Sequence, residues 1–93
     1  MDKSGIREML LDEFDMQIAH VDKAAERIHK FDGKLAEAFT SYVKDKKIPE
    51  LSEGKYSFEN LQNDYGLNPI GVFLMLDWLK KDKARAEYAL SLI

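Results

Sequence analysis

Glu26 and His29 are the residues whose types and spacing come nearest to a metal-binding or catalytic pattern. They form a Glu-x-x-His unit, which places a carboxylate and an imidazole on the same face of a helix. Carboxylate-bridged di-metal bundles use this unit twice and add two further glutamates from other helices. This sequence has one copy, because the other histidine, His20, has Gln17 three residues before it. We therefore expect no metal ion, no other cofactor, and a histidine at the surface.

Nucleophilic catalysis and phosphate binding also lack the residue patterns that they require. The chain contains no cysteine, and none of its serines lies in a Gly-x-Ser-x-Gly turn. Neither a glycine-rich phosphate loop nor an EF-hand calcium loop occurs in the sequence. We therefore predict that the protein is not an enzyme, and we assign no catalytic residue and no cofactor-binding residue.

Charge and length restrict the classes of partner. The 93 residues carry a formal net charge of −3, and 33% of them are charged. Nucleic-acid binding normally shows a basic face, which this acidic chain does not offer. The longest apolar run, residues 69–76, is far shorter than the ~20 residues that cross a bilayer. We expect one domain over residues 1–93, located in the cytoplasm, with a protein rather than nucleic acid or membrane as its partner.

Hydrophobic spacing predicts an all-α fold, a small bundle of four to five helices. A long amphipathic helix is expected over residues 3–30, where apolar residues recur every three or four positions. At 1.5 Å per residue it would be about 40 Å long, more than a compact domain of this size accommodates. Further helices are expected over four ranges: 34–46, 58–65, 69–81 and 83–92. A loop containing Ile48 and Leu51 is expected before the third helix, with both side chains against the core.

The helix over residues 69–81 is apolar on nearly all sides, which is typical of a helix at the centre of a core. Phe73 and Trp78 are therefore expected to be largely buried. Asp77 interrupts this apolar segment and permits two interpretations. Its carboxylate either contacts a partner protein, or pairs with Lys80 or Lys81 three and four residues further on.

Residues 58–77 resemble a helix-turn-helix motif. Gly66 falls at the turn, where a residue free to adopt positive φ is needed. The motif's buried positions are occupied by Leu61, Tyr65, Leu67, Val72 and Met75. The positions that would face a DNA groove hold Asn68, Pro69, Ile70, Phe73, Leu74 and Asp77. Base readout uses Arg, Lys, Asn or Gln, whereas four of these six residues are apolar and one is acidic. The pattern favours a helix pair used for packing or for a protein partner, and a DNA-binding transcriptional regulator is the alternative.

A seam of apolar residues runs along the expected first helix, with alternating spacings of four and three as in a coiled coil. The candidate interface residues on it are Leu10, Phe14, Gln17, Val21 and Ile28. Gln17 either fixes the register of a dimer or lies at an edge where its amide reaches water. Because the helix is too long for a compact monomer, we predict a homodimer formed through it, or docking of another protein on it. The predicted function is a non-enzymatic protein–protein interaction or regulatory module that self-associates.

Overall fold

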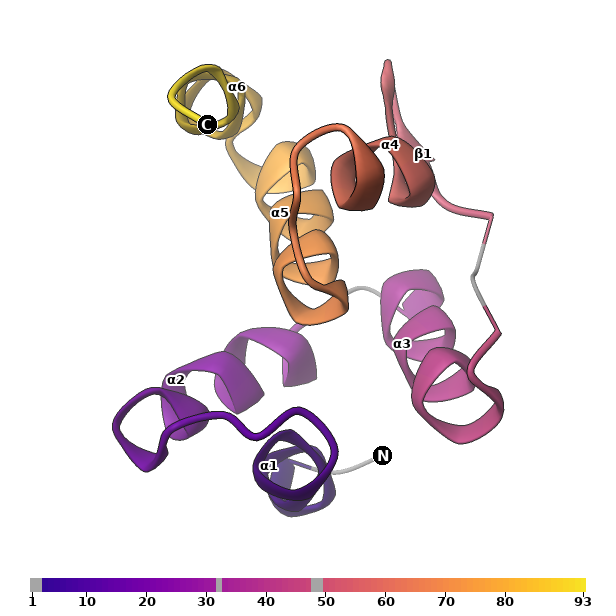
Figure 1. The fold of residues 1–93 in the computed structure, drawn as a ribbon, viewed down its shortest axis with the longest axis vertical. Helices are drawn as coiled ribbons and strands as arrows, with labels where there is room; N and C mark the ends of the chain where they lie inside the picture. Colours follow the sequence, from indigo (N-terminus) through magenta and orange to yellow (C-terminus); the bar gives the residue numbers. More distant parts are fainter. Residues whose placement is uncertain (1–2, 32, 48–49) are drawn as a thin grey trace. The chain divides into compact units, whose positions relative to one another are not determined.

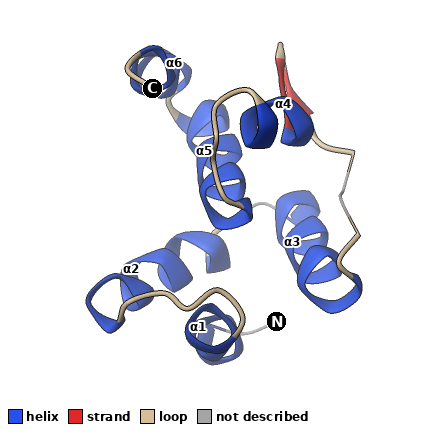
Figure 2. Cartoon of the chain, viewed as in Figure 1, coloured by secondary structure: helices blue, strands red, loops and turns tan. Residues whose placement is uncertain are grey.

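The structure, a computed structural model, describes residues 3–31, 33–47 and 50–93 and is predominantly helical (Figures 1 and 2). The chain divides into two compact units, Met1–Lys47 and Ile48–Ile93. The first contains α1 (Lys3–Asp12), α2 (Ile18–His29) and α3 (Gly33–Asp45). The second contains a hairpin, β1 (Ser52–Glu53) and β2 (Tyr56–Ser57), followed by α4 (Phe58–Asn63), α5 (Pro69–Lys81) and α6 (Lys83–Ser91). The predicted all-α class is confirmed. The prediction of one domain stays a prediction, and each unit is described by itself.

The predicted long first helix is wrong, because the chain leaves the helix after Asp12 and α2 begins only at Ile18. Asp15 in the intervening turn has a positive φ of 50°, a conformation that Asp tolerates better than most residues. The next N–H, that of Met16, donates to the carbonyl of Leu10 at 3.0 Å and closes the end of α1. The apolar residues on both sides keep their helical spacing, so periodicity carries no sign of the break. The helix of about 40 Å, on which the predicted dimer depended, is therefore not formed.

α1 and α2 pack against each other within the first unit, and Figure 1 shows α1 end-on while α2 runs across the view. The buried residues of the two helices are Ile6, Leu10, Val21, Ala24, Ala25 and Ile28. At the surface the Arg7 Nε lies 2.6 Å from the Asp22 Oδ1. The two short helices thus bury their apolar faces on each other, as one long helix could not.

Phe14, in the turn between α1 and α2, contacts α3. Its ring stacks with those of Phe39 and Tyr42, both at a centroid separation of 6.4 Å. Beside it the Lys46 Nζ lies 3.2 Å from the Glu13 Oε2. α3 begins and ends one residue earlier than predicted. It ends before Lys46 because that residue adopts a positive φ of 54°.

α5 is the central helix of the second unit, since α4, β1 and α6 all contact it (Figure 1). Phe73 is fully buried, and its ring meets that of Phe58 of α4 edge-on at a centroid distance of 5.3 Å. The predicted burial of Phe73 is therefore confirmed. Trp78, also expected to be largely buried, is half-buried and lies with Gly71 and Leu74 on the least covered face of α5. A helix that is apolar all round has no polar stripe to indicate which side stays uncovered.

Each helix of the second unit begins after a residue whose side chain caps its first turn. The Ser57 Oγ accepts from the Asn60 N–H at 3.1 Å, and the Asn60 Oδ1 accepts from the Ser57 N–H at 2.9 Å. This reciprocal pair is a capping box, which satisfies two N–H groups at the start of α4. Asn68 and Asp82 each accept from the backbone N–H three residues on, at 2.7 and 3.3 Å. α4 ends two residues before its predicted end, ahead of Gly66 at a φ of 69°.

The predicted loop before α4 contains the short antiparallel hairpin, in which Glu53 pairs with Tyr56. Gly54 forms the turn with a φ of 61°. Strands of two residues are too short to show the alternation that identifies a strand in a sequence. Leu51 is buried, as predicted, whereas Ile48 lies outside the described residues.

Candidate functional site

The residues of the predicted interface do not form one continuous seam. Leu10, Val21 and Ile28 are buried inside the chain, and Phe14 is half-buried against α3. Gln17 is exposed at the start of α2, and its side chain makes no capping hydrogen bond, which agrees with the alternative that its amide reaches water. The prediction of a continuous seam is therefore wrong, because these residues belong to two helices and a turn. A partner contact by any of them stays a prediction.

Asp77 forms the ion pair that was its alternative interpretation. Its Oδ1 lies 3.0 Å from the Lys81 Nζ, one turn further along α5. The residue is buried among the apolar side chains of α5, so little of its carboxylate is left for another molecule. Its contact with a partner stays a prediction.

α4 and α5 are present where the helix-turn-helix resemblance places a helix pair. Of the positions that would face a DNA groove, Ile70, Phe73 and Asp77 are buried, and Pro69 and Leu74 are half-buried. A helix that reads base edges must present such side chains to the groove. Ile70 and Phe73 belong to the core instead, whereas Asn68 is exposed and caps α5. The resemblance to the motif stays a prediction.

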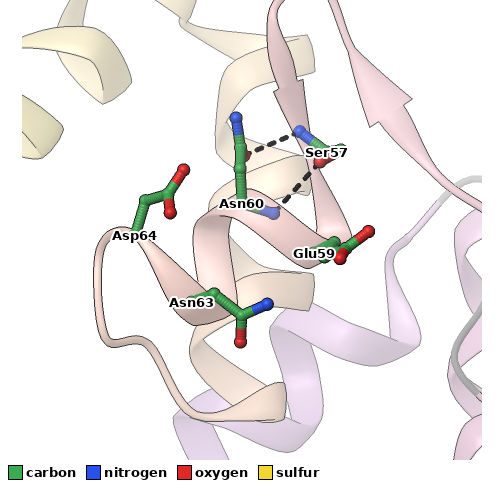
Figure 3. A pocket seen from close by; sticks show the side chains of 5 residues that line it. All are labelled: Ser57, Glu59, Asn60, Asn63 and Asp64. Atoms are coloured by element: carbon green, nitrogen blue, oxygen red, sulfur yellow. Dashed lines mark hydrogen bonds between the residues drawn. The ribbon is translucent and has the colours of Figure 1, made fainter.

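A polar pocket of about 190 Å³ lies on α4 (Figure 3). It is lined by Ser57, Glu59, Asn60, Asn63 and Asp64. Ser57 and Asn60 are engaged in the capping box, and the Asn60 Nδ2 also donates to the Lys55 carbonyl at 3.1 Å.

The remaining polar groups of this pocket do not converge. Figure 3 shows Glu59 and Asp64 on opposite sides of Asn60, with the Glu59 carboxylate pointing away from it. Ligand pockets usually enclose about 300–1,000 Å³ and are mostly apolar, whereas this one is smaller and polar. With Ser57 and Asn60 engaged in the capping box, the pocket offers the hydrogen-bonding groups of Glu59, Asn63 and Asp64.

The Glu-x-x-His unit on α2 lies on the surface. The Glu26 Oε1 pairs with the Lys30 Nζ at 3.3 Å, and His29 is exposed. In residues 3–31, 33–47 and 50–93 there is no group of three or more His, Asp or Glu side chains placed to hold a metal ion.

α6 carries large apolar side chains on its outer face. Tyr88 and Leu92 are 66% and 70% exposed. They lie four residues apart, Leu92 being the C-cap residue that follows α6, and Ala84, one turn before Tyr88, is exposed as well. The opposite face of α6 buries Ala86 and Leu90. We define the outer face of α6 as Ala84, Tyr88 and Leu92.

The sequence analysis predicted a helix over residues 83–92 but did not divide its apolar residues between a buried and an exposed face. The signal was present, because residues two apart on a helix point to different sides. Once Leu90 packs inward, Tyr88 and Leu92 must point outward. The sequence does not say which of the two sides packs inward.

A cluster around Glu87 ties α6 to the hairpin. The Glu87 Oε2 accepts from the Tyr56 hydroxyl at 3.4 Å and lies 3.8 Å from the Lys55 Nζ. The Lys55 Nζ also lies 5.2 Å from the centroid of the Tyr56 ring. A hydrogen bond to the Tyr56 side chain, and then the charges of Tyr56 and Glu87, raise the pKa of Lys55. These contacts hold one side of α6 against the hairpin, which helps to fix the side of α6 that faces outward.

Two observations on the whole chain complete the description. None of the described helices combines the length and the apolar character needed to span a bilayer. Compared with models of protein families, with curated proteins and with solved structures, the chain gives no match.

Proposed function

We propose that this chain is a non-enzymatic protein-interaction module that self-associates through the outer face of α6. The observation that carries the proposal is the exposure of Tyr88 and Leu92, 66% and 70%, four residues apart at the C-terminal end of α6. Covering a large apolar side chain stabilises a complex by roughly 1.5–3 kcal/mol before the cost of association. A second copy brings the same two side chains, so a two-fold pair buries four of them.

The chemistry of the surface supports interaction rather than catalysis. Tyr is enriched where protein surfaces bind each other, because its ring buries a large area while its hydroxyl can stay in water. We also propose a cytoplasmic location, because a chain without cysteine suits a reducing compartment.

Sedimentation velocity across a range of concentrations tests the proposal. The average mass should rise toward that of a dimer as the concentration approaches ~100 μM, where complexes of micromolar affinity are populated. The double variant Tyr88→Glu, Leu92→Glu should sediment as a single chain at the same concentration, because it places four carboxylates in the contact.

Ile18→Glu is the matched control. Ile18 is a large apolar residue on α2, 72% exposed, so the substitution places one carboxylate per chain, where the double variant places two, on an exposed apolar position of another helix. It should leave the association unchanged. A wild-type chain that keeps the mass of one copy at ~100 μM, or an Ile18→Glu variant that dissociates like the double variant, contradicts the proposal.

A DNA-binding regulator of the helix-turn-helix class remains the alternative. It has less support, because Ile70, Phe73 and Asp77 are buried and the chain has a formal net charge of −3. We expect no binding of duplex DNA at physiological salt. An affinity tighter than the non-specific range, roughly 10⁻⁶ M, would favour the alternative.

A further inference from the structure

We infer that α6 pairs with α6 of a second copy in an antiparallel orientation, with Tyr88 at the two-fold axis. The inference rests on the proposed self-association and adds to it the arrangement of the two chains. Two independent features of α6, the sizes of its outer side chains and the position of its charges, point to this arrangement.

The sizes of the outer side chains fit an antiparallel pair. Ala84 and Leu92 lie four residues, about 6 Å, on either side of Tyr88 along the helix. When two such faces meet antiparallel about Tyr88, the small Ala84 of each copy lies opposite the large Leu92 of the other. A parallel pair would set Leu92 against Leu92 at one end and leave a gap between two alanines at the other. Since packed protein surfaces leave few voids, the antiparallel pair is the better fit.

The position of charge on α6 leads to the same arrangement. Arg85 borders the outer face at its Ala84 end, and its side chain is 73% exposed with a loose contact of 4.0 Å to Asp82. α6, which the structure describes over its whole length, has no basic residue in its last turn. The carbonyl groups there carry the partial negative charge of a helix C-terminus.

An antiparallel second copy supplies the missing cation, because it places its Arg85 beside that last turn. This happens at both ends of the pair, since the arrangement is symmetric. A parallel copy would place the two Arg85 guanidinium groups side by side, where like charges repel.

The remaining groups near the outer face do not oppose burial. Ser91 donates its hydroxyl to the Tyr88 carbonyl at 2.6 Å, so this polar group keeps a hydrogen bond when water leaves. Glu87 is turned toward the hairpin, where it contacts Tyr56 and Lys55. The outer face therefore carries no carboxylate that a second copy would have to desolvate.

Cysteine crosslinking tests the arrangement. Because the natural chain has no cysteine, any disulfide that forms must join the introduced cysteines. Ala84→Cys and Leu92→Cys chains, distinguished by a tag on one of them, are mixed and oxidised mildly. The mixture should give a disulfide between the two kinds of chain. Ala84→Cys alone should give little, because the two copies of residue 84 would lie eight residues, about 12 Å, apart along the axis. Disulfides need Cα atoms within about 7 Å. The control is Ser41→Cys, on the exposed surface of α3, which measures the rate of crosslinking by random collision.

The outcomes separate this inference from the proposed function. Efficient crosslinking of Ala84→Cys with itself would overturn the antiparallel pair while leaving self-association intact. Crosslinking of the mixture no faster than that of Ser41→Cys would overturn it too. A chain that stays monomeric refutes the proposed self-association as well.

A charge variant gives a second, independent readout of the same pair. Arg85→Gln should weaken dimerisation by about 3- to 30-fold, because two helix C-termini lose a cation and each such contact contributes modestly. Arg85→Lys should restore most of the affinity, since it returns the positive charge. An Arg85→Gln chain that dimerises as well as the wild type contradicts the antiparallel pairing of charges.

Discussion

Phe73 is the core residue whose truncation best tests the description of the second unit. Its side chain is 0% exposed, and its ring meets the ring of Phe58 edge-on at 5.3 Å. Replacing a buried Phe by Ala typically costs about 3–5 kcal/mol, from lost transfer free energy and from the cavity left behind. The aromatic pair contributes roughly 0.5–1.5 kcal/mol beyond its buried area. We expect Phe73→Ala to lose stability near the upper part of the range, because no polar group or water-exposed side lets the site relax outward.

Urea unfolding followed by far-ultraviolet circular dichroism measures this loss. Small proteins lose about 1–3 kcal/mol of stability per molar urea, so the midpoint should fall by about 1–5 M. Small domains have total stabilities of about 5–15 kcal/mol, so a substantial part of the variant could be unfolded without urea. The helical signal at zero urea is therefore recorded as well.

Leu74→Ala is the matched control for Phe73→Ala. Leu74 is the next residue on α5 and is half-buried, so its truncation exposes less new apolar surface and leaves a smaller cavity. Its midpoint should fall by less than half as much. Equal midpoints for Phe73→Ala and the wild type would refute the reasoning, because α5 would then not be the centre of this unit.

Four further predictions follow from backbone geometry, helix capping and charge. Asp15→Gly should raise the melting temperature, because glycine adopts the φ of 50° without steric strain. Gly66→Ala should lower stability by about 1 kcal/mol through backbone strain at positive φ, because no neighbouring atom lies within 4 Å of the added methyl group to cause a clash. Melting temperatures that shift in the same direction for both variants would contradict the explanation of the two turns. Ser57→Ala should cost about 1 kcal/mol by removing half of the capping box, and an unchanged melting temperature would show that the cap does not stabilise α4. NMR titration should give Lys55 a pKa above its ordinary 10.5. Because this pKa is raised in the folded state, the contribution of Lys55 to stability is complete below pH 10.5 and is lost as the pH rises through the folded value. A Lys55 pKa at or below 10.5 contradicts the pairing with Tyr56 and Glu87.

Helix starts could be predicted from the sequence because capping is local. Ser57, Asn68 and Asp82 each bond to an N–H three residues away, so a window of four residues contains the whole interaction. α5 accordingly begins and ends at the predicted residues. The all-α class could be predicted for a similar reason, since helical periodicity repeats within each segment.

The turn at Asp15 was missed because its signal is weak and was outweighed by periodicity. An aspartate can adopt positive φ, but most aspartates do not. The turn is held by contacts with residues far along the chain, namely the rings of Phe39 and Tyr42 against Phe14. Gly66, which ends α4 in the same conformation, was recognised because glycine adopts it without strain.

The sequence by itself determined where most helices begin, which residues are apolar enough to be buried, and which catalytic patterns are missing. Only the tertiary structure decided which apolar faces are covered. Trp78, Tyr88 and Leu92 are as apolar in the sequence as Phe73 and Leu90, yet only the last two are fully covered. The reason is physical: burial against any apolar neighbour stabilises an apolar side chain. The residue type therefore does not determine which neighbour covers it. The neighbour is set by turns and by contacts between distant segments, such as the one between Glu87 and the hairpin that helps to orient α6.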